Sequence, residues 1–193
     1  INSPQRPNGM VVGQLEEIAA ICAEHNVIVL TDEIFSHMVY APSEHKTIAA
    51  VDGMADRSIL VDTFSKTYIM TGFRIGWCVA SKELITAMAT IQGQSTSNAS
   101  SMAQKAAVAA LNGDQDCVAK MNESFKQRHD FVVAGLNAIP GISCLPGAGT
   151  FYAFADVTGR VAHAIMDLCN EPDAMTHPQG MQIKVSRQEL SRL

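Results

Sequence analysis

Two short apolar runs, each followed directly by polar side chains, place the strongest constraint on how this chain can fold. Residues 27–31 (Val-Ile-Val-Leu-Thr) and residues 58–62 (Ser-Ile-Leu-Val-Asp) are rich in β-branched and other apolar residues. Near-continuous runs of this kind are typical of strands that are buried on both faces of a parallel sheet. Residues 73–80 form a third run, and helical periodicity appears at residues 14–25 and 82–91. The order predicts an α/β domain with a mainly parallel sheet.

Helical patterns dominate the middle of the chain and change in character near Asn112-Gly113-Asp114. Further helices are expected over residues 101–111 and 115–138, and strands over residues 142–144 and 151–154. We therefore expect residues 1–113 to belong to a larger α/β domain, and residues 114–193 to form a linking helix and part of a smaller α+β domain. The opening residues 1–9, with two prolines, are expected to form a loop, and residues 171–193 show only weak periodicity.

Composition restricts the classes of partner. The net charge of −5 does not favour a general nucleic-acid surface, although a few placed Arg or Lys residues can still bind an anionic small molecule. The five cysteines are scattered without a CxxC pair, so reduced thiols and no metal site are expected. Without a signal pattern or an apolar run of about 20 residues, the chain is expected to be soluble and cytoplasmic, with no membrane partner.

Polar side chains that are candidates for catalysis or ligand binding follow the first two predicted strands. Asp32 comes directly after residues 27–31, whereas Thr63, Ser65 and Lys66 come directly after residues 58–62, and Arg74 lies a little further on. Because ligands of open α/β sheets bind at the carboxyl ends of the strands, these side chains are candidates for one crevice.

This set of groups matches what pyridoxal phosphate requires. Lys66 offers an amine for the aldehyde, and Asp32 offers a carboxylate that favours the protonated ring nitrogen. Arg74, with the hydroxyls of Thr63 and Ser65, can bind the phosphate. Taken singly, however, a strand-end Asp is more often a loop residue or helix cap, and a lone Lys or Arg is more often solvated. The residues alone therefore predict an anion-binding α/β domain with a candidate Schiff-base lysine.

A resemblance to a known family narrows this interpretation. Residues 62–77 (Asp-Thr-Phe-Ser-Lys-Thr-Tyr-Ile-Met-Thr-Gly-Phe-Arg-Ile-Gly-Trp) resemble the lysine signature of class I, fold type I, pyridoxal-phosphate-dependent aminotransferases. Residues 31–34 resemble the family's ring-nitrogen aspartate motif. Residues 94–98 and 149–154 are similar to the subgroup that includes bacterial aspartate and prephenate aminotransferases. The resemblance implies the family's large domain in part, followed by part of its small domain.

The resemblance also implies roles for individual residues. Lys66 would form the Schiff base and carry a proton between the substrate Cα and the cofactor C4′. Asp32 would pair with the pyridine nitrogen, and Arg74, Ser65 and Thr63 would hold the phosphate. The implied substrates are an amino acid, aspartate-like or aromatic, and a 2-oxo acid, and the implied assembly is a homodimer.

The sequence departs from the family at three points. Residues 6–9 read Arg-Pro-Asn-Gly where the family has Asn-Pro-Thr-Gly, and Phe35 stands where the family has Tyr, so both usual donors to the cofactor's phenolic oxygen are replaced. One hypothesis is that Arg6 supplies the missing donor and a positive charge; the alternatives are degeneration or an Arg directed to the surface. Members of the family are also considerably longer, so the chain is expected to be a fragment, and only Lys184 weakly resembles the family's carboxylate-binding Arg.

Three other interpretations fit the same residues. The fold also hosts lyases and decarboxylases, because the cofactor carries the chemistry and the protein selects the bond. The chain is also compatible with an aminotransferase-like ligand-sensing domain of a transcription regulator, or with a fragment that is inert by itself.

Overall fold

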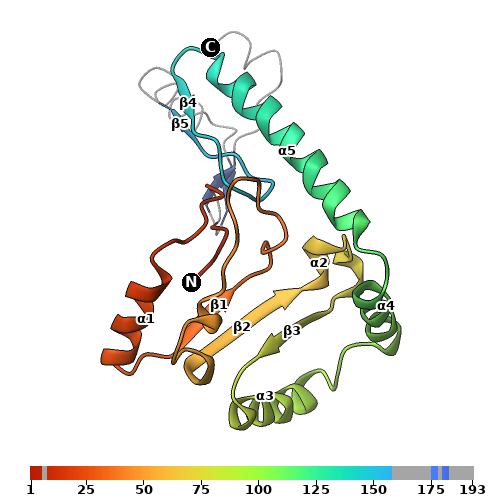
Figure 1. The fold of residues 1–193 in the computed structure, drawn as a ribbon. Coiled ribbons are helices and arrows are strands. Elements are labelled where there is room, and N and C mark those ends of the chain that lie inside the picture. The colour runs from red at the N-terminus through yellow and green to blue at the C-terminus, as the bar shows by residue number, and fades with distance from the viewer. Residues whose placement is uncertain (6–7, 158–174, 178–179, 183–193) are drawn as a thin grey trace. The chain divides into compact units, whose positions relative to one another are not determined.

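The computed structural model describes residues 1–5, 8–157, 175–177 and 180–182 (Figure 1). The chain divides into two compact units. One consists of Ile1–Asp130 with Pro146–Ala153, and the other of Phe131–Leu145 with Phe154–Leu193. The two units therefore divide inside a helix. The expected boundary at residue 113, which concerns the domains of a longer protein, stays a prediction.

The first unit is built on a three-stranded sheet in which β2 (Ser58–Thr63) lies between β1 (Val29–Asp32) and β3 (Gly76–Val79) (Figure 1). The strands expected over residues 27–31 and 58–62 are observed as β1 and β2, and they pair in parallel with Asp32 opposite Val61. The expected burial on both faces is wrong for β1, in which Val29 and Thr31 are buried but Leu30 is 54% exposed. β3 pairs antiparallel with β2, so the described sheet is mixed rather than mainly parallel. The connection from β2 to β3 is short and contains α2 (Phe64–Thr67) and the 3₁₀ turn η3 (Thr71–Phe73). β3 therefore starts at the same end of the sheet at which β2 finishes, and the two strands run in opposite directions.

The opening residues are more regular than the loop that their prolines suggest. Asn2 forms a parallel bridge with Asp32, and the Asp32 amide donates to the Ile1 carbonyl oxygen at 2.9 Å. Hydrogen bonds to the edge of β1 thus override the local turn signal for the first three residues.

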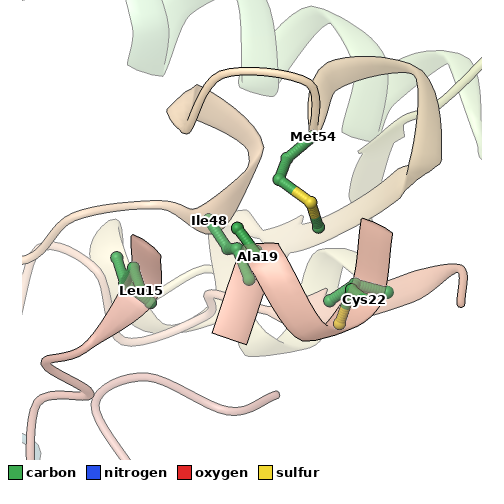
Figure 2. Packing of buried hydrophobic residues seen from close by; sticks show 6 residues of the cluster. Leu15, Ala19, Cys22, Ile48 and Met54 are labelled. Atoms are coloured by element: carbon green, nitrogen blue, oxygen red, sulfur yellow. The ribbon is translucent and has the colours of Figure 1, made fainter. Parts of the chain in front are cut away.

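A hydrophobic core forms between helix α1 (Leu15–Glu24) and the segments around β1 (Figure 2). Apolar residues at positions i, i+4 and i+7 of α1 lie on one face and pack together. A Leu, Ile, Val or Met side chain contributes about 1.5–3 kcal/mol when it is fully buried, and the smaller Ala and Cys side chains contribute less. The cluster consists of Leu15, Ala19, Cys22, Val29, Ile48 and Met54.

The remaining helices follow the sequence pattern closely. Serine side chains cap the starts of two of them: Ser81 accepts from the Leu84 amide, and Ser100 accepts from the Ala103 amide. In the part of the chain that the structure describes, no helix has the length and apolarity that a bilayer crossing requires. These helices are α3 (Lys82–Ser95), α4 (Ser101–Asn112) and α5 (Asp116–Asn137), with short 3₁₀ helices η1 (Ile48–Ala50) and η2 (Ala55–Arg57).

The second unit contains two antiparallel hairpins. β4 (Ile142–Cys144) pairs with β5 (Ala155–Val157), and β6 (Met175–His177) pairs with β7 (Gly180–Gln182). The strand expected at residues 151–154 was wrong in position, because the preceding residues are held in the first unit: the Thr150 amide donates to the Met38 carbonyl oxygen at 2.8 Å. β6 and β7 lie in a region where the sequence predicted no element, and the rest of the tail after Gly159 lies outside the described residues.

Candidate active site

The parallel pairing of β1 and β2 brings the predicted strand-end residues to one edge of the sheet. Asp32 is the last residue of β1, and β2 runs on to Thr63, where α2 begins. With Asp32 opposite Val61, the turn that carries Ser65 and Lys66 starts only two residues further along the neighbouring strand. The expectation that these groups share the carboxyl edge is therefore consistent with the observed register, although their individual roles stay predictions.

Asp32 is half-buried and its surroundings are ordered by backbone hydrogen bonds. One carboxylate oxygen, Oδ1, accepts from the Ile34 amide at 3.3 Å. The carbonyl oxygen of Asp32 accepts from the Ser3 amide at 3.3 Å and from the Asn2 side chain at 3.3 Å. These contacts hold the backbone of Asp32, which carries the carboxylate, in place.

Thr63 organises the turn that leads to Lys66. Its hydroxyl oxygen accepts from the Ser65 amide at 3.2 Å, which caps α2, and it lies 3.0 Å from the Ser65 hydroxyl. The same hydroxyl donates to the Ile75 carbonyl oxygen at 2.8 Å. Because a threonine hydroxyl has a single proton, this bond leaves Thr63 as an acceptor toward Ser65. Direct binding of a phosphate by Thr63 stays a prediction, whereas its capping of α2 is observed.

Lys66 lies in the single turn of α2, half-buried, with its Nζ atom 5.2 Å from the centroid of the Phe151 ring. An ammonium group over an aromatic face is attracted by the ring quadrupole. Phe64 and Thr67 of the same turn are buried, and Phe64 packs with Met70 and Ala107. The helix is therefore anchored by its apolar side while the amine is directed to an aromatic surface.

Phe151 belongs to a cluster of four aromatic rings. Phe35, which is 1% exposed, meets Phe151 edge-on at 5.3 Å and Tyr152 at 5.8 Å. Phe125 of α5 lies 5.6 Å from Phe151. Phe35 is thus a fully buried ring of this aromatic cluster. The sequence drew attention to residues 149–154 but did not predict that Phe151 contacts Lys66, since only the folded chain brings them together.

Glycines permit the close approach that holds Phe151 in place. A Cβ atom on Gly149 would lie 2.3 Å from the Met38 carbonyl oxygen, and one on Gly9, whose φ is +69°, would lie 2.3 Å from the Gly149 carbonyl oxygen. The neighbouring Gly147 amide donates to Nε2 of His129 at 2.9 Å. These backbone contacts connect the loop near Gly9 with the segment that carries Phe151.

The structure describes one of the two predicted cofactor-binding arginines, Arg74, but not the other, Arg6. Arg74 is exposed, takes the left-handed conformation (φ 51°, ψ 50°), and donates to the Thr71 carbonyl oxygen of its own turn at 2.9 Å. Its expected contact with the cofactor phosphate stays a prediction. Arg6 lies outside the described residues, so its proposed interaction with the phenolic oxygen also stays a prediction.

A group of acidic side chains surrounds the end of β1. Burial raises the pKa of Asp62 to about 6, a hydrogen bond from the Thr63 amide opposes this rise, and the negative charges of Glu33 and Asp32 add to it. Burial also acts to raise the pKa of Glu33. Hydrogen bonds from His45, Thr47 and Thr31 outweigh that effect and hold the Glu33 pKa below its usual value.

Comparison with known proteins adds an independent line of evidence. Residues 1–178 match the family model described as aminotransferase class I and II. The chain is 42% identical over 166 residues to an aspartate/prephenate aminotransferase of Nitrosomonas europaea, covering 84% of this chain and 42% of that protein. It is 44% identical over 166 residues to an aspartate aminotransferase of Streptomyces avermitilis, covering 84% of this chain and 41% of the relative.

Solved structures that are similar to this chain are also aminotransferases. The aspartate aminotransferase from Rhizobium meliloti superposes with a TM-score of 0.79 at 37% identity, covering 96% of this chain and 44% of that one. The aromatic aminotransferase from Pyrococcus horikoshii gives 0.77 at 36% identity, covering 80% and 42%. The chain thus spans less than half the length of each of these similar proteins.

Proposed function

Because this chain belongs to the aminotransferase class I and II family, we propose that the protein uses pyridoxal 5′-phosphate to transfer an amino group from an amino acid to a 2-oxo acid. The observation that carries the proposal is the placement of Lys66 directly after β2, at the same sheet edge as Asp32 at the end of β1.

The residues at this edge fit the cofactor's chemical groups. The half-buried carboxylate of Asp32 suits a protonated pyridine nitrogen, because partial burial strengthens an ion pair relative to water. The Ser65 hydroxyl and the exposed Arg74 guanidinium suit the phosphate. When bound, the cofactor supplies an electron sink for the carbanion at the substrate Cα.

Lys66 would act as the group that moves protons. Its Nζ atom, when neutral, can accept the proton from the substrate Cα and return it at the cofactor C4′. The Phe151 ring beside Nζ excludes water from one side of the amine and limits the directions that the side chain can take. Asp32 would keep the ring nitrogen protonated during this transfer.

The choice of substrate is proposed from the relatives. Proteins similar to this one are named aspartate, aspartate/prephenate and aromatic aminotransferases, which supports an aspartate-like or aromatic amino acid as the donor. We further propose that the protein is a homodimer located in the cytoplasm.

Reconstitution tests the proposal. Wild type incubated with pyridoxal phosphate is expected to acquire a visible absorbance band that persists through gel filtration, whereas Lys66→Ala is expected to lose it. Adding aspartate and then 2-oxoglutarate should bleach and restore the band. A band that persists unchanged in Lys66→Ala would contradict the assignment of Lys66. Release of carbon dioxide or of a sulfur compound from a cognate amino acid would instead indicate a lyase or decarboxylase.

A further inference from the structure

Glu33 is a buried carboxylate that directly follows Asp32 and is 5% exposed. Its Oε1 atom accepts from the hydroxyls of Thr31, at 3.1 Å, and Thr47, at 2.5 Å. Its Oε2 atom lies 2.9 Å from Nε2 of His45. A buried carboxylate is costly unless its oxygens are hydrogen-bonded, and here both oxygens have partners.

The hydrogen bonds of Glu33 connect three segments of the first unit. Thr47 caps η1, whose first residue, Ile48, is in the hydrophobic core (Figure 2). The Glu33 amide donates to the Val61 carbonyl oxygen at 2.9 Å, which ties the end of β1 to β2. The Glu33 side chain therefore links the end of β1 to the segment of residues 45–47, while its backbone links the same point to β2.

Asp32 and Glu33 are directed to opposite faces of the strand end. Successive side chains along an extended strand point to opposite faces, and the Thr31 side chain meets that of Glu33 on one face. Asp32, between them, is thereby directed to the other face. A rotation of the strand end that released Glu33 would also turn the Asp32 carboxylate. An apolar residue would fill the Glu33 position at lower desolvation cost, but it would supply no directional bonds.

We propose that Glu33 is a positioning residue, which holds the Asp32 carboxylate in register with the cofactor's ring nitrogen through its hydrogen bonds to Thr31, Thr47 and His45. The role of the ring nitrogen rests on the proposed function; the ordering of Asp32 by Glu33 does not. In this role Glu33 acts through Asp32.

The first test measures the geometry of Asp32 in the chain without cofactor. The Ile34 amide donates to Oδ1 of Asp32, so its hydrogen-exchange rate reports on the position of that carboxylate. Thr47→Val removes one donor to Glu33, together with the side-chain cap of η1, with little change in shape, and Thr47→Ser restores both. Exchange at Ile34 is expected to accelerate about tenfold in Thr47→Val and to return toward wild type in Thr47→Ser.

A matched control separates positioning from a general loss of stability. Ile48→Val removes one methylene from the core beside Thr47 without touching the hydrogen bonds, and is expected to cost about 1 kcal/mol. Exchange at Ile34 relative to exchange in α1 should stay at the wild-type ratio in Ile48→Val and should rise in Thr47→Val. Equal ratios in the two variants would overturn the proposal, even if both are destabilised.

The second test addresses the ring nitrogen by using two cofactors. Thr47→Val is expected to weaken pyridoxal phosphate binding about tenfold and to leave unchanged the binding of the analogue with carbon in place of the ring nitrogen. An equal loss for both would show that Glu33 does not act through the ring nitrogen. If wild type binds neither, the proposed function fails for this chain, and the exchange ratios still decide whether Glu33 orders Asp32.

Discussion

The Nζ atom of Lys66 lies over the ring of Phe151, 5.2 Å from its centroid, although the two residues come from distant parts of the sequence. The contact depends on two separately anchored segments. α2 is fixed by the buried Phe64, and the segment before Phe151 is fixed by the bond from the Thr150 amide to the Met38 carbonyl oxygen. The position of the reactive amine is therefore set by long-range packing as well as by the local turn.

The aromatic cluster should contribute measurably to stability. Phe151→Ala removes contacts with Phe35, Phe125 and Tyr152, and because Phe151 is 39% exposed we expect a loss of about 2 kcal/mol, below the range for fully buried Phe. Urea unfolding followed by the fluorescence of Trp77, the chain's single tryptophan, measures this loss.

A control for this change is Phe131→Ala. Phe131 is 79% exposed on α5, so its removal should change the free energy of unfolding by less than about 0.5 kcal/mol. Equal losses in Phe151→Ala and Phe131→Ala would show that the cluster does not hold Phe151 in the way described.

Two glycines provide opposite predictions for the same substitution. Gly149→Ala places a Cβ atom 2.3 Å from a backbone oxygen that cannot move away easily, so we expect a loss of about 3 kcal/mol or more. Gly93 lies in α3, where a Cβ atom would meet no heavy atom within 4 Å, and Gly93→Ala should stabilise the helix by about 0.5–1 kcal/mol. Thermal unfolding of the two variants checks the signs, and a stabilising Gly149→Ala would contradict the packing of this segment.

Asp62 should make stability depend on pH between about 4 and 6. Its pKa is raised from 3.8 to about 6, so over this range the folded state binds more protons than the unfolded state, and stability falls as pH rises. The destabilisation is complete above the folded pKa and absent below the unfolded one.

The variant Asp62→Asn isolates this effect, because the amide oxygen can still accept from the Thr63 amide. Asp62 is only partly buried, so after allowance for solvent screening we expect the variant to be about 1 kcal/mol more stable than wild type at pH 7. The two proteins should converge below pH 4. A difference that is the same at pH 4 and pH 7 would show that it does not arise from ionisation of Asp62. Urea unfolding across this pH range measures the difference.

The parts of the fold that the sequence predicted are those determined by local pattern. The apolar, β-branched runs that became β1 and β2 predicted strands correctly, although β1 buries only one of its faces. The polar residues that follow them were placed at one edge by the rule for parallel strands. Helix α1 followed from its spacing of apolar residues, which form one packed face.

The parts that it did not predict depend on tertiary contacts. Ile1–Ser3 directly precedes a proline but pairs with β1, and the expected strand at residues 151–154 is displaced because Thr150 is held by Met38. The direction of β3 depends on the tight return through α2 and η3, and strand composition alone does not indicate the direction of a strand. Likewise, no local pattern could place Phe151 against Lys66 or connect Glu33 to Thr47.

The most direct measurement of the central claim is chemical mapping of the cofactor's attachment point. Wild type loaded with pyridoxal phosphate is reduced with borohydride, digested and analysed by mass spectrometry. The account predicts stoichiometric modification of the peptide that contains Lys66, and only trace modification of exposed lysines such as Lys120. Equal labelling of Lys66 and the exposed lysines, or preferential labelling elsewhere, would contradict it.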